Sequence, residues 1–162
     1  MQYNCIFETN QNFKIMNSIY NKVDNDKIIT RIKSLTPDSK AIWGKMSVDQ
    51  MLKHSNDVML VAFGEKKLKI NFLMRFLGKM MKNKVINSEF KKNSPTAPEF
   101  IFKEKYDFYV VQSESSINFS RFAVGHDAIK EMDHPFWGKM TFEDWDKLMW
   151  NHIDHHLRQF GV

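Results

Sequence analysis

One stretch near the C terminus decides the fold: residues 141–160 read TFEDWDKLMWNHIDHHLRQF. Apolar and ring-bearing side chains recur in it every three or four residues, which is the period of a helix with one inward face. The inward face collects Trp145, Leu148, Met149, His152, His156 and Gln159. The pattern predicts a helix from Thr141 to about Phe160 that carries two histidines on its inner side.

A five-residue pattern at the start of this helix also precedes a second predicted helix. WGKMT at residues 137–141 repeats WGKMS at residues 43–47. Ser47 and Thr141 can each cap a helix, and Gln50 or Asp144 lies three residues later, as in a capping box. The second helix is expected to run from Ser47 to Gly64, with one stripe formed by Met51, His54, Ser55, Val58, Val61 and Ala62.

A helix near the N terminus and a long middle region extend the helical pattern. Spacing of Ile28, Ile32 and Leu35 predicts a helix over about residues 24–35, which the dipeptide Thr36-Pro37 stops. Residues 68–81 are rich in Leu, Phe and Met and predict an extra short helix packed on the others, with a position on a membrane surface as the rarer alternative. Residues 91–98 are a loop by their turn residues.

The remaining helix is expected over about residues 99–122, where the pattern is ambiguous. Residues 106–111 have strand propensity. Val110, Ile117 and Val124 recur at intervals of seven residues and favour a helix instead. The chain is therefore predicted to be an all-α domain with four main helices.

The composition is that of one globular domain. The chain has 162 residues, of which 43% are hydrophobic and 27% charged. We expect the domain to span residues 16–162, after an N-terminal tail of residues 1–15. The longest apolar run, residues 58–63, is far shorter than the about 20 residues of a membrane span. Cys5 is the one cysteine, so we expect no disulfide framework and a reducing, cytoplasmic location.

Basic residues concentrate in one segment. The net charge is +5, and nine Lys or Arg between residues 66 and 92 face only Glu65 and Glu89. Such a segment can attract phosphates or anionic lipid. A solvated basic face is the simpler interpretation, because no nucleic-acid-binding motif accompanies it.

Three histidines form the candidate metal site. His152 and His156 are four residues apart, so both point from the same helix face toward one ion. His54 lies about 10 Å along its own helix, while the pair lies about 16 and 22 Å along the last helix. If these helices run antiparallel over about 30 Å, His54 comes level with the midpoint of the pair.

Three neutral imidazoles without a carboxylate leave one coordination position open, as in catalytic sites. Zinc and nickel are the first choices for the divalent ion, and iron, copper and cobalt also suit imidazole. Such an ion could lower the pKa of a bound water or bind a thiolate. The histidines alone do not distinguish these two uses.

Other polar residues near the site have secondary roles in this interpretation. Gln159 could hydrogen-bond a ligand ring or the substrate, and His155, about 100° off the ligand face, is expected to be exposed or to support a ligand ring. We expect His134 to be structural, and His126 has no predictable partner. The sequence contains no Gly-rich phosphate loop, no G-x-S-x-G and no two Glu-x-x-His motifs that could form a pair, since only Glu131 and His134 have this spacing.

The segments that carry these histidines resemble the DinB/YfiT-like superfamily of metal-dependent proteins. The resemblance extends from about residue 24 to the C terminus, and its most specific parts are WGKMS (43–47) through His54 and HPFWG (134–138) through HIDHHLRQFG (152–161). These parts resemble in particular one branch of unknown function. The resemblance implies a four-helix bundle whose metal ligands match His54, His152 and His156.

Some members of that superfamily are thiol S-transferases, and others are described as hydrolases. The resemblance therefore implies a metal-dependent transferase acting on a low-molecular-weight thiol, or a hydrolase, each with a small-molecule substrate. A non-enzymatic bundle that binds a metal or ligand is the alternative, and hydrogen-bonded core histidines without a metal are a third. The sequence leaves a homodimer open.

Overall fold

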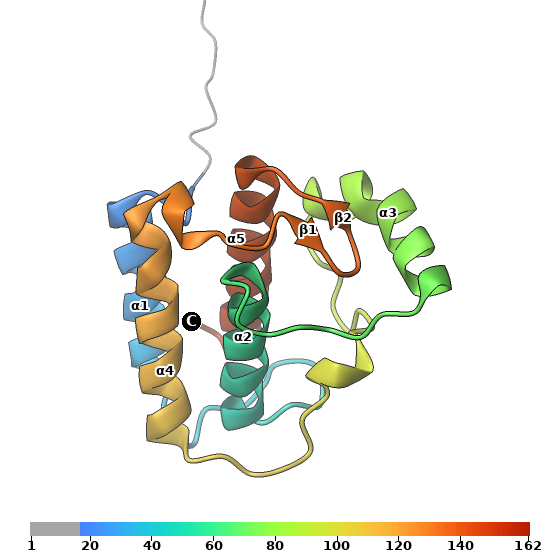
Figure 1. The fold of residues 1–162 in the computed structure, drawn as a ribbon. Helices are drawn as coiled ribbons and strands as arrows, with labels where there is room; N and C mark the ends of the chain where they lie inside the picture. The colour runs from blue at the N-terminus through green and yellow to red at the C-terminus, as the bar shows by residue number, and fades with distance from the viewer. Residues whose placement is uncertain (1–16) are drawn as a thin grey trace, which may run out of the picture.

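Helices make up most of the structure, a computed structural model that describes residues 17–162 (Figure 1). Within this range the α-helices are α1 (Lys22–Ser34), α2 (Val48–Ala62), α3 (Phe72–Ile86), α4 (Phe108–Arg121) and α5 (Phe142–Gln159). Single 3₁₀ turns form η1 (Pro98–Phe100), η2 (Phe122–Val124) and η3 (His126–Ala128). A small antiparallel hairpin pairs β1 (Asp133–His134) with β2 (Gly138–Lys139). The all-α expectation is confirmed; the predicted tail at residues 1–15 and Cys5 lie outside the described residues.

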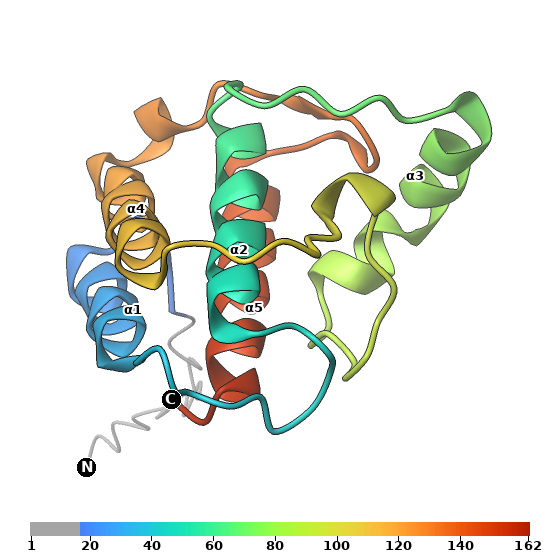
Figure 2. The ribbon, with the colours of Figure 1, turned by 90° about the horizontal axis from the view of Figure 1, so that it is seen from below.

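The helices α1, α2, α4 and α5 lie side by side, whereas α3 stands to one side of them (Figures 1 and 2). Helix α5 runs antiparallel to α2, and α4 runs in the same direction as α2, because the long connection through α3 and η1 brings the chain back to the other end (Figure 1). The core is filled by fully buried side chains from all four packed helices, among them Ile28, Leu52, Phe119, Trp145 and Leu157.

The capping residues place the starts of α2 and α5 where the repeated pattern predicts them. The Thr141 amide donates to Asp144 Oδ2 at 2.9 Å, and the Asp144 amide donates to Thr141 Oγ1 at 3.0 Å. The Ser47 amide donates to Gln50 Oε1 at 3.1 Å. These bonds satisfy amides that the first helical turn leaves without intrahelical partners. They fix the start of each helix, and so the depth of the histidines it carries.

Helix α4 exists, but its predicted start is wrong. It begins at Phe108 rather than near residue 99, because the Asp107 side chain accepts the Tyr109 and Val110 amides as an N-cap. Val110 and Ile117 are 52% and 60% exposed, and Val124, in η2, is 69% exposed. The buried side chains of α4 are instead Phe108, Val111, Ser115 and Phe119. The seven-residue spacing therefore marked the outer face.

Helix α3 departs most from expectation. It has 15 residues, as many as α2, so it is not a short helix. Its contacts with the rest of the chain are made to α5 and to the β hairpin, and only Gly78 and Ile86 are buried within it. The expected packing on the other helices is found at α5, but most apolar side chains of α3 face away from them. Within residues 17–162, no helix combines the length and apolarity needed to cross a bilayer.

Candidate metal centre

His54 of α2 and the pair His152 and His156 of α5 converge in the structure as the helix geometry predicts. The His54 ring centroid lies 4.9 Å from that of His152 and 4.9 Å from that of His156. His54 is therefore level with the midpoint of the pair. One ring nitrogen from each of the three residues lies within 4.8 Å of the other two. Among residues 17–162, these three histidines are the group of potential metal ligands whose side chains lie close together.

A backbone carbonyl sets the tautomer of His54. Its Nδ1 lies 3.1 Å from the Phe100 carbonyl oxygen of η1. Because a carbonyl only accepts hydrogen bonds, Nδ1 carries the proton and Nε2 presents its lone pair. That Nε2 lies 2.9 Å from His152 Nε2. The outer hydrogen bond thus aims the nitrogen of His54 that could bind a metal at the other histidines.

Gln159 sets the tautomer of His156 in the same way. The Gln159 side-chain Nε2 donates to the Trp43 carbonyl oxygen at 2.7 Å. This leaves Gln159 Oε1 to accept from His156 Nδ1 at 2.9 Å. Gly44 permits this approach, because a Cβ there would lie 2.4 Å from Gln159 Nε2. The first copy of the repeated WGKM segment therefore supports His156, a candidate ligand on α5. Gln159 hydrogen-bonds the ring of a candidate ligand, which is one of the two roles considered for it.

Burial keeps the three imidazoles neutral. It lowers the pKa of His54 below its ordinary value, although the Phe100 carbonyl and Asp57 act in the opposite direction. Burial, with a smaller contribution from the neighbouring histidines, lowers the pKa of His152 well below its ordinary value. The pKa of His156 falls to about 3, mainly through burial. A neutral imidazole is the form that binds a metal ion.

The separations fit a shared ion. Two imidazole nitrogens bound to one ion at about 2.0–2.1 Å lie about 2.9 Å apart at a right angle and about 3.4 Å apart in a tetrahedron. His54 Nε2 and His152 Nε2 lie 2.9 Å apart, which is also a hydrogen-bond distance, and the third nitrogen lies within 4.8 Å of both, so it would move closer to share the ion. The donor set suits zinc, nickel and other imidazole-binding ions.

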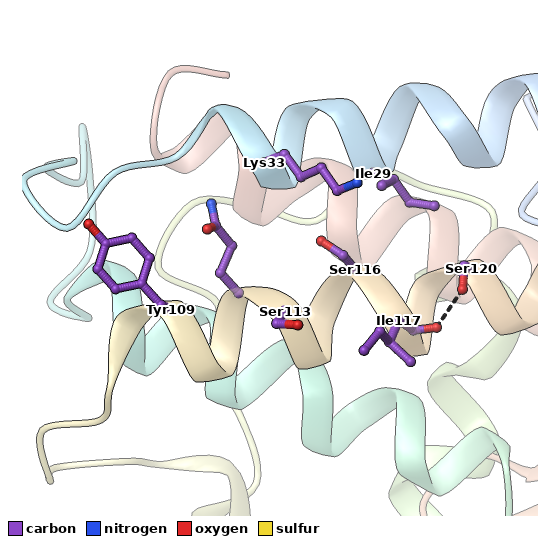
Figure 3. Close-up of a pocket in the computed structure, with 8 residues that line it drawn as sticks. Ile29, Lys33, Tyr109, Ser113, Ser116, Ile117 and Ser120 are labelled. Atoms are coloured by element: carbon purple, nitrogen blue, oxygen red, sulfur yellow. Dashed lines mark hydrogen bonds between the residues drawn. The ribbon is translucent and has the colours of Figure 1, made fainter.

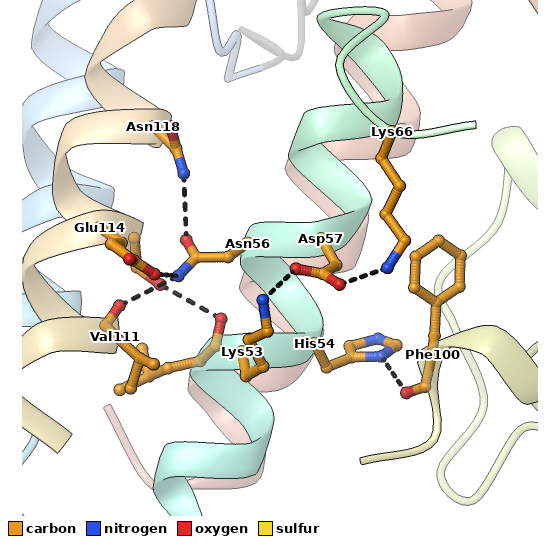
Figure 4. Close-up of polar contacts among 11 residues, drawn as sticks. Lys53, His54, Asn56, Asp57, Lys66, Phe100, Val111, Glu114 and Asn118 are labelled. Atoms are coloured by element: carbon orange, nitrogen blue, oxygen red, sulfur yellow. Dashed lines mark hydrogen bonds and ion pairs between the residues drawn. The ribbon is translucent and has the colours of Figure 1, made fainter. Parts of the chain in front are cut away.

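A buried ion-pair network holds the segment that supplies the Phe100 carbonyl (Figure 4). Asp57, one turn beyond His54 on α2, accepts from Lys53 Nζ at 2.8 Å and from Lys66. The Lys66 Nζ lies over the Phe100 ring, 5.4 Å from its centroid. A cation over a ring face is attracted to it, so the network ties η1 to α2. Through Lys66, this network contacts the residue whose carbonyl pairs with His54.

The histidines form part of the wall of a cavity of about 610 Å³. His54, His152, His155 and His156 lie on one part of its lining. Much of the remaining lining is apolar and includes Met46, Val58, Phe90, Phe136, Trp137 and Leu148. A few polar groups beside an apolar cavity are typical of small-molecule sites. The cavity is large enough for a molecule of that class.

A second hollow, of about 450 Å³, lies between α1 and α4 (Figure 3). Its wall includes Ile29, Lys33, Tyr109, Ser116 and Ile117. No histidine, cysteine or carboxylate from the described part of the chain lines it. Its residues offer no chemistry comparable with that of the three histidines.

The other histidines take structural or supporting positions. His134 Nδ1 accepts the Phe136 and Trp137 amides at 3.0 and 3.2 Å, so it stabilises the hairpin, although it also lines the cavity. His126 stacks on Phe142 with ring centroids 4.2 Å apart. His155 is half-buried and meets the His156 ring edge-on at 5.3 Å. It therefore lies beside the ring of a candidate ligand rather than with the three converging nitrogens.

Sequence reasoning missed two parts of the site. The Phe100 carbonyl lies in a stretch predicted as helix, and a backbone oxygen leaves no mark on residue identity. The Asp57 network was also missed, although Asp57 sits on the α2 face next to His54 and four residues after Lys53. A carboxylate among the buried positions of that helix was the one available signal.

Comparison with known proteins places the chain in a family. A family model described as "Protein of unknown function (DUF1569)" matches residues 19–161. No curated protein and no solved structure matches the chain. The match covers α1 to α5, and with them His54, His152, His156 and the groups that orient them. The chain therefore belongs to the DUF1569 family.

Proposed function

We propose that this protein is a metal-dependent enzyme in which His54, His152 and His156 hold one divalent ion, zinc or nickel in the first place. One observation carries the proposal: three neutral imidazoles, two of them oriented from outside by Phe100 and Gln159, converge on the wall of an apolar cavity. Nitrogen lone pairs gathered at one point in this way are the donor set that a divalent ion such as zinc binds.

The most favoured activity is transfer of a small thiol to an electrophilic substrate. When bound, the ion supplies charge that favours the thiolate form of the thiol. The cavity beside the histidines takes the apolar part of the acceptor and excludes water from it. The thiol sulfur then forms a bond to the electrophilic carbon, the leaving group departs with the bonding pair, and the thiol proton passes to solvent. Hydrolysis, with water in place of the thiol, is the alternative reaction at this site.

The same proposal includes the bundle type. Helices α1, α2, α4 and α5 would form a four-helix bundle of the DinB/YfiT-like type, with α3 and η1 inserted between α2 and α4. The convergence of one histidine from α2 with an H-x-x-x-H pair from α5 supports this assignment. A cytoplasmic location is also proposed, because a single cysteine fits a reducing compartment.

Turnover with defined thiols tests the activity. Protein loaded with zinc or nickel is mixed with low-molecular-weight thiols and a panel of apolar electrophiles, and thioether formation is followed by mass spectrometry. We expect metal-dependent turnover that His152→Ala abolishes and His126→Ala retains, since His126 lies outside the site. No metal-dependent thioether or hydrolysis product across the panel would contradict an enzymatic role.

A non-enzymatic metal- or ligand-binding protein is the second candidate. The depth of the site favours it, since His54 and His156 are only 3% and 8% exposed and a bound ion would join α2 to α5. In that case a chelator would unfold the protein, and no substrate would turn over. Circular dichroism before and after chelation separates the two roles, because an enzyme whose core folds without metal keeps its helices.

A further inference from the structure

Helix α3 is amphipathic, but its apolar side faces outward. Phe72, Leu73 and Met80 are 84%, 64% and 69% exposed, and Phe76 and Leu77 are 52% and 44% exposed. Helical spacing puts these five side chains on one side, which we call the α3 apolar face. An amphipathic helix of a globular protein normally turns such a face to the core. On α3 it meets solvent.

The basic side of α3 faces the rest of the molecule. Arg75 Nη2 donates to both carboxylate oxygens of Asp133 at 2.7 Å, and Lys82 pairs with Asp144 at 2.7 Å. Gly78 packs closely against the hairpin, because a Cβ there would lie 2.2 Å from the Phe136 carbonyl oxygen. Charge pairs and a close backbone approach therefore fix the outward orientation of the apolar face.

Exposed lysines occur on α3 and just before it. Lys79 and Lys84 are exposed on α3 itself, and Lys67 and Lys69 are exposed just before it. No acidic residue occurs between Lys66 and Ser88. An outward apolar face with lysines beside it is the pattern of a helix that lies in the plane of an anionic membrane surface.

We propose that α3 docks this protein on the surface of an anionic lipid bilayer, with the α3 apolar face inserted among the lipid headgroups and acyl chains. Charge decides between a bilayer and a second copy of the chain. A symmetric contact between two copies would bring the same lysines together, and like charges across an interface oppose association. Anionic lipid neutralises them. This inference does not depend on the metal site.

Vesicle sedimentation tests the proposal. The full chain is mixed with vesicles of phosphatidylcholine containing a quarter phosphatidylglycerol, and with vesicles of phosphatidylcholine alone. We expect the protein to pellet with the anionic vesicles, and binding to fall as salt is raised, because salt screens the lysines. Phe72→Ser combined with Phe76→Ser should lower the partition coefficient about tenfold or more, since two aromatic side chains no longer enter the bilayer.

The matched control is Val110→Ser combined with Ile117→Ser, which removes two side chains of 52% and 60% exposure from α4. It should bind as the unchanged chain does. Lys79→Glu with Lys84→Glu should weaken binding to anionic vesicles alone. All substituted side chains are exposed, so circular dichroism should be unchanged, and His152→Ala should still bind vesicles. Failure of the chain to bind anionic vesicles at low salt, or equal binding by the Phe72/Phe76 variant, would overturn the proposal. A dimer in analytical ultracentrifugation that this variant dissociates, without vesicle binding, would assign the face to a second copy.

Discussion

Globular proteins normally bury apolar side chains and expose polar ones, and helices α5 and α3 depart from this pattern in opposite directions. Helix α5 turns polar rings inward, where His156 is 8% exposed, whereas α3 turns apolar side chains outward, where Phe72 is 84% exposed. A buried polar ring and an exposed apolar face both cost free energy unless something compensates for them. The two helices imply different partners. Helix α5 implies an ion bound inside the domain, and α3 implies a surface that the domain contacts from outside. Substitutions on the two helices should therefore have separable effects.

The largest effect is expected from losing a ligand on the inward side. His152→Ala removes one of three nitrogens, and metal content should fall from about one ion per chain to near zero. Inductively coupled plasma mass spectrometry of purified protein measures it. The matched control is His155→Ala, the neighbouring histidine outside the converging group, which should keep its metal. Equal metal content in the His152 variant and the unchanged chain would contradict the role of His152 as a ligand.

Removing the partner of a ligand should have a smaller effect. Gln159→Leu leaves His156 in place but frees its ring to rotate, so metal affinity should fall about 10- to 100-fold. Competition with a chromogenic chelator measures the change. Ser113→Ala, on the outer part of α4, serves as the control. Unchanged affinity in the Gln159 variant would show that the hydrogen bond to His156 does not position the ligand.

Lowering the pH should have the next largest effect, a loss of folding stability that comes from the buried histidines. Burial lowers the pKa of His156 to about 3, whereas the unfolded chain takes up this proton near pH 6.5. Below about pH 6.5 the unfolded state therefore binds more protons than the folded state, and stability falls as pH drops toward 3. Urea denaturation of metal-free protein at pH 7, 6 and 5 should show a falling midpoint. A midpoint that stays constant over this range would argue against neutral buried imidazoles.

The smallest effect is expected on the outward side. Leu73→Ser, at 64% exposure on α3, should change the free energy of unfolding by less than about 0.5 kcal/mol. Leu157→Ala, fully buried on α5, is the contrasting variant and should cost about 2–5 kcal/mol. Thermal denaturation compares the two. A large destabilisation by Leu73→Ser would mean that the α3 apolar face packs against the chain itself.

The sequence predicted best what depends on helix geometry alone. His54 was placed level with the midpoint of His152 and His156 from rise per residue and two capped starts, and the structure agrees. The spacing of Val110 and Ile117 correctly favoured a helix for α4, but spacing alone does not show which side meets the core, and both side chains are exposed.

For a related reason, the orientation of α3 and the position of the Phe100 carbonyl could not be predicted from the sequence. Both are set by long connections between α2 and α4, whose path depends on tertiary contacts such as that between Gly78 and Phe136. Periodicity correctly identified α3 as amphipathic. It could not show that Arg75 and Lys82 would find Asp133 and Asp144, and so turn the apolar side outward.

X-ray absorption spectroscopy of the zinc-loaded chain tests the central claim, a single ion shared by His54, His152 and His156, most directly. The spectrum should show three imidazole nitrogens at about 2.0–2.1 Å and at least one further light ligand. His54→Ala should lose one imidazole from this shell or fail to bind zinc at all. A shell with no imidazole, or one that is identical in the unchanged chain and in His54→Ala, would contradict the claim.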